Sequence, residues 1–131
     1  MVKKFTLGKT ERLKSRKAID DLFEKGQSFT VPPLRVIYLI TQSGGLQFAV
    51  GVSARHFKKA VDRNTIKRKI REAYRLQKIP LQELLQAHEK GMNVFFTYNG
   101  KEIPAHTTVV SSVDRCLSKL VKKIENHTPD T

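Results

Sequence analysis

The side chains best suited to chemistry in this chain are cations that recur along residues 62–75, DRNTIKRKIREAYR. At about 100° per residue, a helix over this segment gathers them on one polar arc. The arc consists of Arg63, Asn64, Lys67, Arg68 and Arg71, extended by Arg75. One guanidinium group can donate two parallel hydrogen bonds to the oxygens of one phosphate, whereas an ammonium group acts as a point charge. The spacing therefore predicts a surface for phosphate groups.

The adjoining arc of the same helix is apolar. Ile66, Ile70 and Tyr74 recur at the spacing of a stripe that faces a core, and Asp62 is a candidate N-cap. Glu72 is the one acid inside the helix, so little of the positive charge is neutralised by neighbours. Because like charges at helical spacing repel by a few tenths of a kcal/mol per pair, a polyanion on this arc would offset the cost.

The segment before this helix adds more positive charge. Arg55, Lys58 and Lys59 lie in a basic loop, and residues 53–78 hold ten lysines and arginines against two acids. The whole chain of 131 residues has a net charge of +13. Since well over half of that surplus lies in one-fifth of the chain, it indicates a footprint for a polyanion. Nucleic acid fits this footprint better than an anionic membrane.

Residues for autonomous catalysis are not apparent. The four histidines do not pair at metal-ligand spacing, and the single cysteine, Cys116, lies in an apolar helical stripe. The sequence has no phosphate loop, no dinucleotide-binding glycine motif and no nucleophile elbow. We expect no catalytic residue, no metal site and no bound cofactor in the protein itself. Without a signal peptide or an apolar run of membrane-spanning length, we expect a cytosolic protein.

The elements that must position the cations follow from periodicity and turn signals. A helix is expected up to Lys25, with Ser15 as its N-cap and Gly26 as the residue after its end. Pro32 and Pro33 then break the chain. Strands are expected over 34–41, 46–53 and 92–98, and further helices over 81–90 and 108–125. Because a Ser-Gly-Gly turn joins the first two strands, they are expected to form a β-hairpin.

This order predicts an α+β fold, a two-layer sandwich of helices on a small, mainly antiparallel sheet. We expect one domain over residues 1–131, with a basic N-terminal arm at 1–14 and a flexible tail at 126–131. In the last helix the apolar face is expected to be Val109, Val113, Cys116, Leu117, Leu120 and Ile124.

The segment GVSARHFKKAVDRNTIKRKIRE resembles the signature of the bacterial ribonuclease P protein subunit. That family has a hydrophobic strand, a short basic loop and then R-N-x-x-K-R-x-x-R on a helix. Arg63, Asn64, Lys67, Arg68 and Arg71 match the motif residue by residue. R-L-K-x(4)-I-x-x-L-F-x-x-G, from Arg12 to Gly26, resembles the family's N-terminal arm and first helix. The resemblance spans roughly residues 10 to 125.

The resemblance implies a left-handed βαβ crossover around the basic helix, a fold shared with a domain of a ribosomal protein. It also implies that a large RNA is the catalytic subunit and that the protein alone is inactive. The holoenzyme would remove the 5′ leader of precursor tRNA, with Mg²⁺ belonging to the RNA active site. The implied partners are that catalytic RNA and the leader, with no membrane and no obligate protein partner.

The family also implies residue roles. The basic arc and the loop residues Arg55, Lys58 and Lys59 would bind the catalytic RNA. A shallow cleft between the first helix and the sheet would bind the single-stranded leader, because aromatic faces stack unpaired bases with little sequence preference. The leader-binding candidates are Arg12, Ile19, Phe23, Val36 and Tyr38.

The chain departs from the family pattern at two of these places. Many members have Arg where this chain has Thr65, and many have Phe where it has Ile19. Three other functions stay open on charge alone: a structural RNA binder of the ribosomal type, a protein-only nuclease and a DNA-binding module. A nuclease would need converging carboxylates, and a duplex reader would need side chains that reach base edges.

Overall fold

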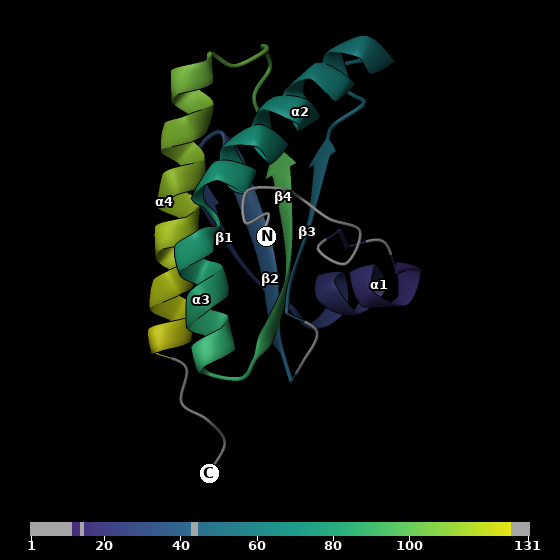
Figure 1. The fold of residues 1–131 in the computed structure, drawn as a ribbon. Helices are drawn as coiled ribbons and strands as arrows, with labels where there is room; N and C mark the ends of the chain where they lie inside the picture. The colour runs from purple at the N-terminus through teal and green to yellow at the C-terminus, as the bar shows by residue number, and fades with distance from the viewer. Residues whose placement is uncertain (1–11, 14, 43–44, 127–131) are drawn as a thin grey trace, which may run out of the picture.

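The computed structural model of the chain describes residues 12–13, 15–42 and 45–126. This part of the chain contains both helices and strands (Figure 1). In order they are α1 (Arg16–Lys25), β1 (Gln27–Val31), β2 (Leu34–Thr41), β3 (Leu46–Val52), α2 (Ala60–Gln77), α3 (Ile79–Ala87), β4 (Gly91–Tyr98) and α4 (His106–Glu125). Most of the predicted arm, residues 1–11 and 14, lies outside the described residues, and so does the tail from 127 onward.

Helix α1 begins and ends for separate reasons. The Ser15 hydroxyl accepts a hydrogen bond from the Ala18 N–H at 3.2 Å, which confirms the predicted N-cap. Gly26 ends the helix, but its backbone is extended (φ −71°, ψ 162°) and not left-handed as a C′ glycine usually is. Here glycine is needed because a Cβ would lie 2.9 Å from the Tyr38 carbonyl oxygen, so α1 could not approach β2 so closely.

The sheet has the strand order β1-β2-β4-β3. The predicted hairpin is therefore wrong: β2 and β3 are consecutive in sequence, but β4 lies between them. β4 pairs antiparallel with β2 and parallel with β3. β2 and β3 therefore lie two strand spacings apart, about 10 Å. β1, which the sequence pattern did not indicate, pairs antiparallel with β2 at the sheet edge.

The connection from β3 to β4 passes through α2 and α3. With these helices in front of the sheet and both strands pointing upward, β4 lies to the left of β3 (Figure 1). The crossover is thus left-handed, opposite to the hand that most parallel connections take. This geometry places the basic helix across the face of the sheet, held there by its own connections.

The sheet buries one face under α2, α3 and α4. Tyr74 of α2 stacks on Phe48 of β3 with 3.8 Å between ring centroids, and Phe96 of β4 meets the Phe48 ring edge-on at 5.1 Å. The predicted inward residues of α2 and all six predicted for α4 are buried. No helix in the described part of the chain is long and apolar enough to cross a bilayer.

The opposite face of the sheet is covered only in part. There α1 packs a smaller cluster, in which Leu13 and Leu22 meet Ile37 of β2. Leu13 reaches this cluster because its N–H donates to the Phe48 carbonyl oxygen at 2.9 Å, beside β3. The two-layer arrangement expected from the sequence holds for the main core, and α1 adds a partial layer behind it.

The thiol of Cys116 is fully buried in the core, and this burial raises its pKa to about 12, although Lys119 lowers it slightly. Since the thiolate is the reactive form, only about one thiol in 10⁴ is ionised at pH 8. We expect native protein to react with a thiol reagent only through unfolding, and protein in 8 M urea to react within the mixing time. Rapid reaction of the native protein would contradict the packing of α4.

Candidate nucleic-acid interface

The loop between β3 and α2 and the first turns of α2 carry a group of mainly cationic side chains that we call the basic surface. Arg55, Lys58 and Lys59 are exposed in the loop, while Asn64, Arg68 and Arg71 are exposed on α2. Lys67 on the same side is half-buried. Its members are Arg55, Lys58, Lys59, Asn64, Lys67, Arg68 and Arg71. All lie on one side because the other side of α2 is the core stripe.

Arg63, predicted as a phosphate ligand, has a structural task as well. Its Nη1 donates hydrogen bonds to the Phe57 carbonyl oxygen at 2.7 Å and to the Lys58 carbonyl oxygen at 2.9 Å. The guanidinium group therefore ties the basic loop to the start of α2. This fixes the loop cations relative to those of the helix, so that one rigid polyanion can meet both.

The start and end of α2 differ from the sequence prediction. The helix begins at Ala60 with Lys59 as its N-cap, so Asp62 lies in the first turn and is not the cap. Its negative charge is still favourable there, near the positive end of the helix dipole. At the other end, Arg75 pairs with Glu72 and Lys78 is fully buried where α2 meets α3. Arg71 is therefore the last exposed cation of the arc along α2.

The role of Arg63 predicts a loss of stability. Charge-assisted hydrogen bonds to carbonyl groups contribute about 1.5–3 kcal/mol when buried, and half-exposure lowers that. We expect Arg63→Ala to reduce the free energy of unfolding in urea by about 1 kcal/mol. The exposed Arg68→Ala serves as the control and should change it by less than about 0.5 kcal/mol. Equal values for both variants would show that Arg63 does not hold the loop.

A second candidate surface lies on the partly covered face of the sheet, and we call it the aromatic surface. The ring of Phe23 on α1 is 52% exposed, and its centroid lies 5.2 Å from that of Phe95 on β4. Phe95 in turn lies over Gly51 of β3, where a Cβ would come within 3.0 Å of the ring. Ile19, which is half-buried, packs against the same small cluster as Phe95. The aromatic surface consists of Ile19, Phe23 and Phe95, over the backbone of Gly51.

Two predicted leader-binding residues lie elsewhere. Val36 is fully buried, and Tyr38 is 4% exposed within the main core, on the sheet face that α2 and α4 cover. The Tyr38 hydroxyl donates to Gln27 Oε1 at 2.8 Å, and burial raises its pKa. Since neighbouring side chains in a strand point to opposite faces, it is Ile37 that faces α1. The assignment of Val36 and Tyr38 to the leader cleft is therefore corrected.

Arg12 is exposed at the open edge of β3, where its backbone forms a bridge with Phe48. It follows directly into Leu13, which packs beneath α1. The structure thus brings Arg12 to the sheet edge that borders α1, and its predicted contact with the leader stays a prediction.

Phe95 was missed in the sequence, although a signal for it was present. Phe95 and Phe96 are adjacent in a strand, so they must point to opposite faces of the sheet. Phe96 is fully buried in the main core, which leaves Phe95 on the side of α1. Two neighbouring aromatic residues in a strand of a one-sided sheet are therefore a signal that one of them serves the outer face.

In the described part of the chain, no three His, Cys, Asp or Glu side chains are gathered so that they could hold a metal ion. The basic surface can bind phosphate groups, and the aromatic surface can stack flat rings. The two lie on opposite faces of the sheet, so they can contact two different segments of nucleic acid at once.

Known proteins resemble this chain over nearly its whole length. The protein-family model described as Ribonuclease P matches residues 7–125. The chain is 35% identical over 130 residues to the ribonuclease P protein component of Porphyromonas gingivalis W83, covering 97% of this chain and 92% of that protein. The protein of the same name from P. gingivalis ATCC 33277 is equally similar.

Solved structures share the fold. The RNase P protein from Thermotoga maritima superposes with a TM-score of 0.67 at 23% identity, covering 83% of this chain and 96% of that one. The Staphylococcus aureus RNase P protein gives a TM-score of 0.65 at 20% identity, covering 88% and 98%. With the family match across nearly the whole chain, these results show that the chain belongs to the ribonuclease P protein component family.

Proposed function

We propose that this chain binds the catalytic RNA of ribonuclease P through its basic surface and the 5′ leader of precursor tRNA through its aromatic surface. In this role it assists removal of the leader, which leaves the mature 5′ end of the tRNA. The observation that carries the proposal is the arrangement of the basic surface. Its cations lie on a loop and a helix joined by Arg63, and the sequence matches the family over the same residues.

Phosphate binding through the basic surface would fix the register of the protein on the RNA without reading its sequence. Asn64 adds a directional donor and acceptor that lysine cannot supply. Arg68 and Arg71 are exposed and lie one turn apart, so each can reach a different phosphate group. The Arg63 side chain would act mainly as a positioning residue, because its Nη1 is already bonded to two loop carbonyl groups.

The aromatic surface suits a single strand of variable sequence. Every base has a flat face, so stacking on Phe23 and Phe95 would tolerate different leaders. Each stacked base contributes about 1–3 kcal/mol by alanine substitution. The half-exposed polar side chains of Asn93 and Thr97 lie on the same strand and the same face as Phe95, where they could meet the sugar-phosphate backbone.

Magnesium in this proposal belongs to the RNA. Mg²⁺ prefers octahedral coordination by oxygen atoms, commonly carboxylates. Among the described residues, the protein gathers no acidic cluster that fits such an ion. The protein would bring cationic charge and a base-stacking platform, while the metal and the attacking hydroxide would be held by the catalytic RNA.

The proposal is tested by comparing two substrates. A bacterial ribonuclease P RNA is titrated with precursor tRNA or with mature tRNA, each with and without the protein. We expect the protein to raise the affinity of the RNA for the precursor by at least about tenfold, which is within the range that one or two stacked bases contribute. The affinity of the RNA for mature tRNA should stay nearly unchanged. Equal effects on both substrates would show that the protein does not contact the leader.

A further inference from the structure

Helix α4 carries a row of cations that the proposed function does not use. Arg115, Lys119, Lys122 and Lys123 follow one another at intervals of four, three and one residues, so they share one side of the helix. All four are exposed. In the part of the chain that the structure describes, none of them is in a salt bridge. We call this row the α4 stripe.

The α4 stripe faces the β1 edge of the sheet, on the side of α4 away from α2. Lys119 Nζ lies 5.5 Å from the centroid of the Phe29 ring on β1. About two turns earlier in α4, the Ser112 hydroxyl donates to the Pro32 carbonyl oxygen at 3.4 Å, just beyond β1. Contact with α2 is made by another side of α4, where Gln77 Nε2 donates to the Val110 carbonyl oxygen at 3.3 Å.

A polar groove of about 350 Å³ continues the α4 stripe toward the start of the helix. Its lining offers hydroxyl groups and one guanidinium group, with no carboxylate. The lining residues are Pro32, Thr107, Thr108, Ser111, Ser112 and Arg115. Hydroxyl and guanidinium groups are the donors that commonly bind phosphate oxygens and sugars of nucleic acids. The groove and the α4 stripe together form a surface that carries hydrogen-bond donors and positive charge along its length.

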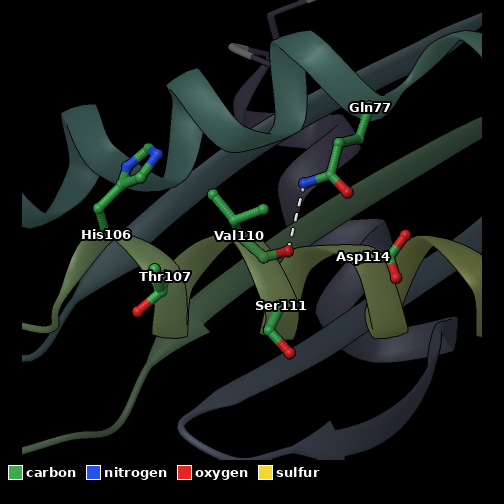
Figure 2. A pocket seen from close by; sticks show the side chains of 6 residues that line it. All are labelled: Gln77, His106, Thr107, Val110, Ser111 and Asp114. Carbon is green, nitrogen blue, oxygen red and sulfur yellow. Dashed lines mark hydrogen bonds between the residues drawn. The ribbon is translucent and has the colours of Figure 1, made fainter.

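The neighbouring groove, on the α2 side of α4, has different chemistry. Figure 2 shows this groove, which has a volume of about 430 Å³, with Gln77 bonded to Val110 at its wall and Asp114 on the same helix. The Asp114 carboxylate would repel a phosphate group placed there. Of the two grooves beside α4, only the one toward β1 fits an anionic backbone.

Helix stability explains part of the charge on α4 but not all of it. Lys122 and Lys123 lie in the last turn, where cations are favourable at the negative end of the helix dipole. Arg115 and Lys119 lie at least one turn further in, where that effect has faded. Their mutual repulsion at i,i+4 spacing is a small cost. The Phe29 ring near Lys119 offsets part of it, and a bound polyanion would remove it.

A membrane surface does not fit the α4 stripe. Helices that lie on bilayers insert large apolar side chains beside their cations. The apolar side of α4, with Val113, Cys116 and Leu120, is buried in the core and cannot serve in this way. The exposed neighbours of the stripe on the same side are small hydroxyl residues, Thr108 and Ser111.

We propose that the α4 stripe and its adjoining groove bind a second backbone segment of the same catalytic RNA that rests on the basic surface. α2 and α4 cover the same face of the sheet (Figure 1), so a large RNA placed on α2 can extend across α4. The aromatic surface lies on the opposite face, which separates the stripe from the leader. The inference rests on the proposed function, since it takes its RNA as the partner.

The test compares two variants with equal loss of charge. Lys119→Ala/Lys122→Ala removes two cations of the α4 stripe, and Lys17→Ala/Lys25→Ala removes two exposed cations of α1. Affinity for a bacterial ribonuclease P RNA is measured without substrate at salt concentrations from about 0.05 to about 0.3 M. Over this range the slope of log K against log[salt] can be determined. We expect the stripe variant to lose about one to two units of slope in log K against log[salt], and roughly tenfold in affinity at 0.1 M. The α1 variant should stay close to the native protein.

Further measurements make each outcome decisive. Lys119→Arg/Lys122→Arg should restore the native slope, and circular dichroism should be the same for all variants. Equal binding by the stripe and α1 variants would overturn the inference. So would a stripe variant that binds the RNA normally but weakens only precursor tRNA binding, or only binding to anionic vesicles. If the native protein did not bind the RNA at all, the proposed function would fail first.

Discussion

Replacing Arg68 and Arg71 by alanine is expected to lower the affinity for the catalytic RNA by roughly 50-fold at 0.1 M salt. Each phosphate contact contributes a slope of about 0.9 in log K against log[salt], which is close to tenfold in affinity at that concentration. Both side chains are exposed, so the loss reflects lost contacts with RNA and not a damaged fold. The measurement is a filter-binding titration repeated at several salt concentrations.

The control for this variant preserves the charge. Arg68→Lys/Arg71→Lys should keep nearly the native salt dependence and lose a smaller factor in affinity, because lysine cannot bind a phosphate group in the bidentate way. Unfolding in urea should be unchanged for both double variants. Native affinity and native salt dependence in the alanine variant would show that the basic surface does not meet RNA.

Phe23→Ala is expected to weaken binding of leader-bearing precursor tRNA to the assembled RNA–protein complex by about 1–3 kcal/mol, or 5- to 150-fold. The Phe23 ring is half-exposed and touches Phe95, so its removal takes away one wall of the aromatic surface and leaves the main core intact. Mature tRNA, which has no leader, should bind this variant as well as it binds the native protein. The measurement is a competition between the two substrates.

A control variant at an apolar residue of similar exposure distinguishes base stacking from a general hydrophobic contribution to binding. Ile103 is 45% exposed in the loop between β4 and α4, away from α1. Ile103→Ala should leave precursor binding unchanged, while Phe95→Leu should weaken it in the same direction as Phe23→Ala. If Phe23→Ala affected precursor and mature tRNA equally, the aromatic surface would not be the leader site.

The helices could be predicted from the sequence because their signals are local. The apolar stripe of α2 and the apolar side of α4 follow from a period of 3.6 residues, and both are buried as predicted. The same period placed Arg68 and Arg71 on the exposed side. Lys78 shows the limit: it would continue the arc in an ideal helix, but α2 ends at Gln77 and Lys78 is buried at the junction with α3.

Strand pairing could not be predicted because it is not local. A short turn between β2 and β3 indicated a hairpin, but the order of strands depends on β4, which begins about forty residues after β3 ends. The sequence also did not determine which side chains of β2 face α1. All of Val36, Ile37 and Tyr38 are apolar or aromatic, so without alternation with polar residues the sequence does not indicate which side faces α1. This is why Val36 and Tyr38 were expected beside α1, although they lie on the face that α2 and α4 cover.

In the proposed function this protein contributes RNA binding, and the active site belongs to the RNA. Cleavage of a 5′-extended precursor tRNA at low magnesium tests it most directly, with protein alone, a bacterial ribonuclease P RNA alone, and both together. We expect cleavage at the mature 5′ end in the mixture only, and Arg68→Ala/Arg71→Ala should weaken it. Cleavage by the protein alone would contradict it, and so would a mixture no more active than the RNA.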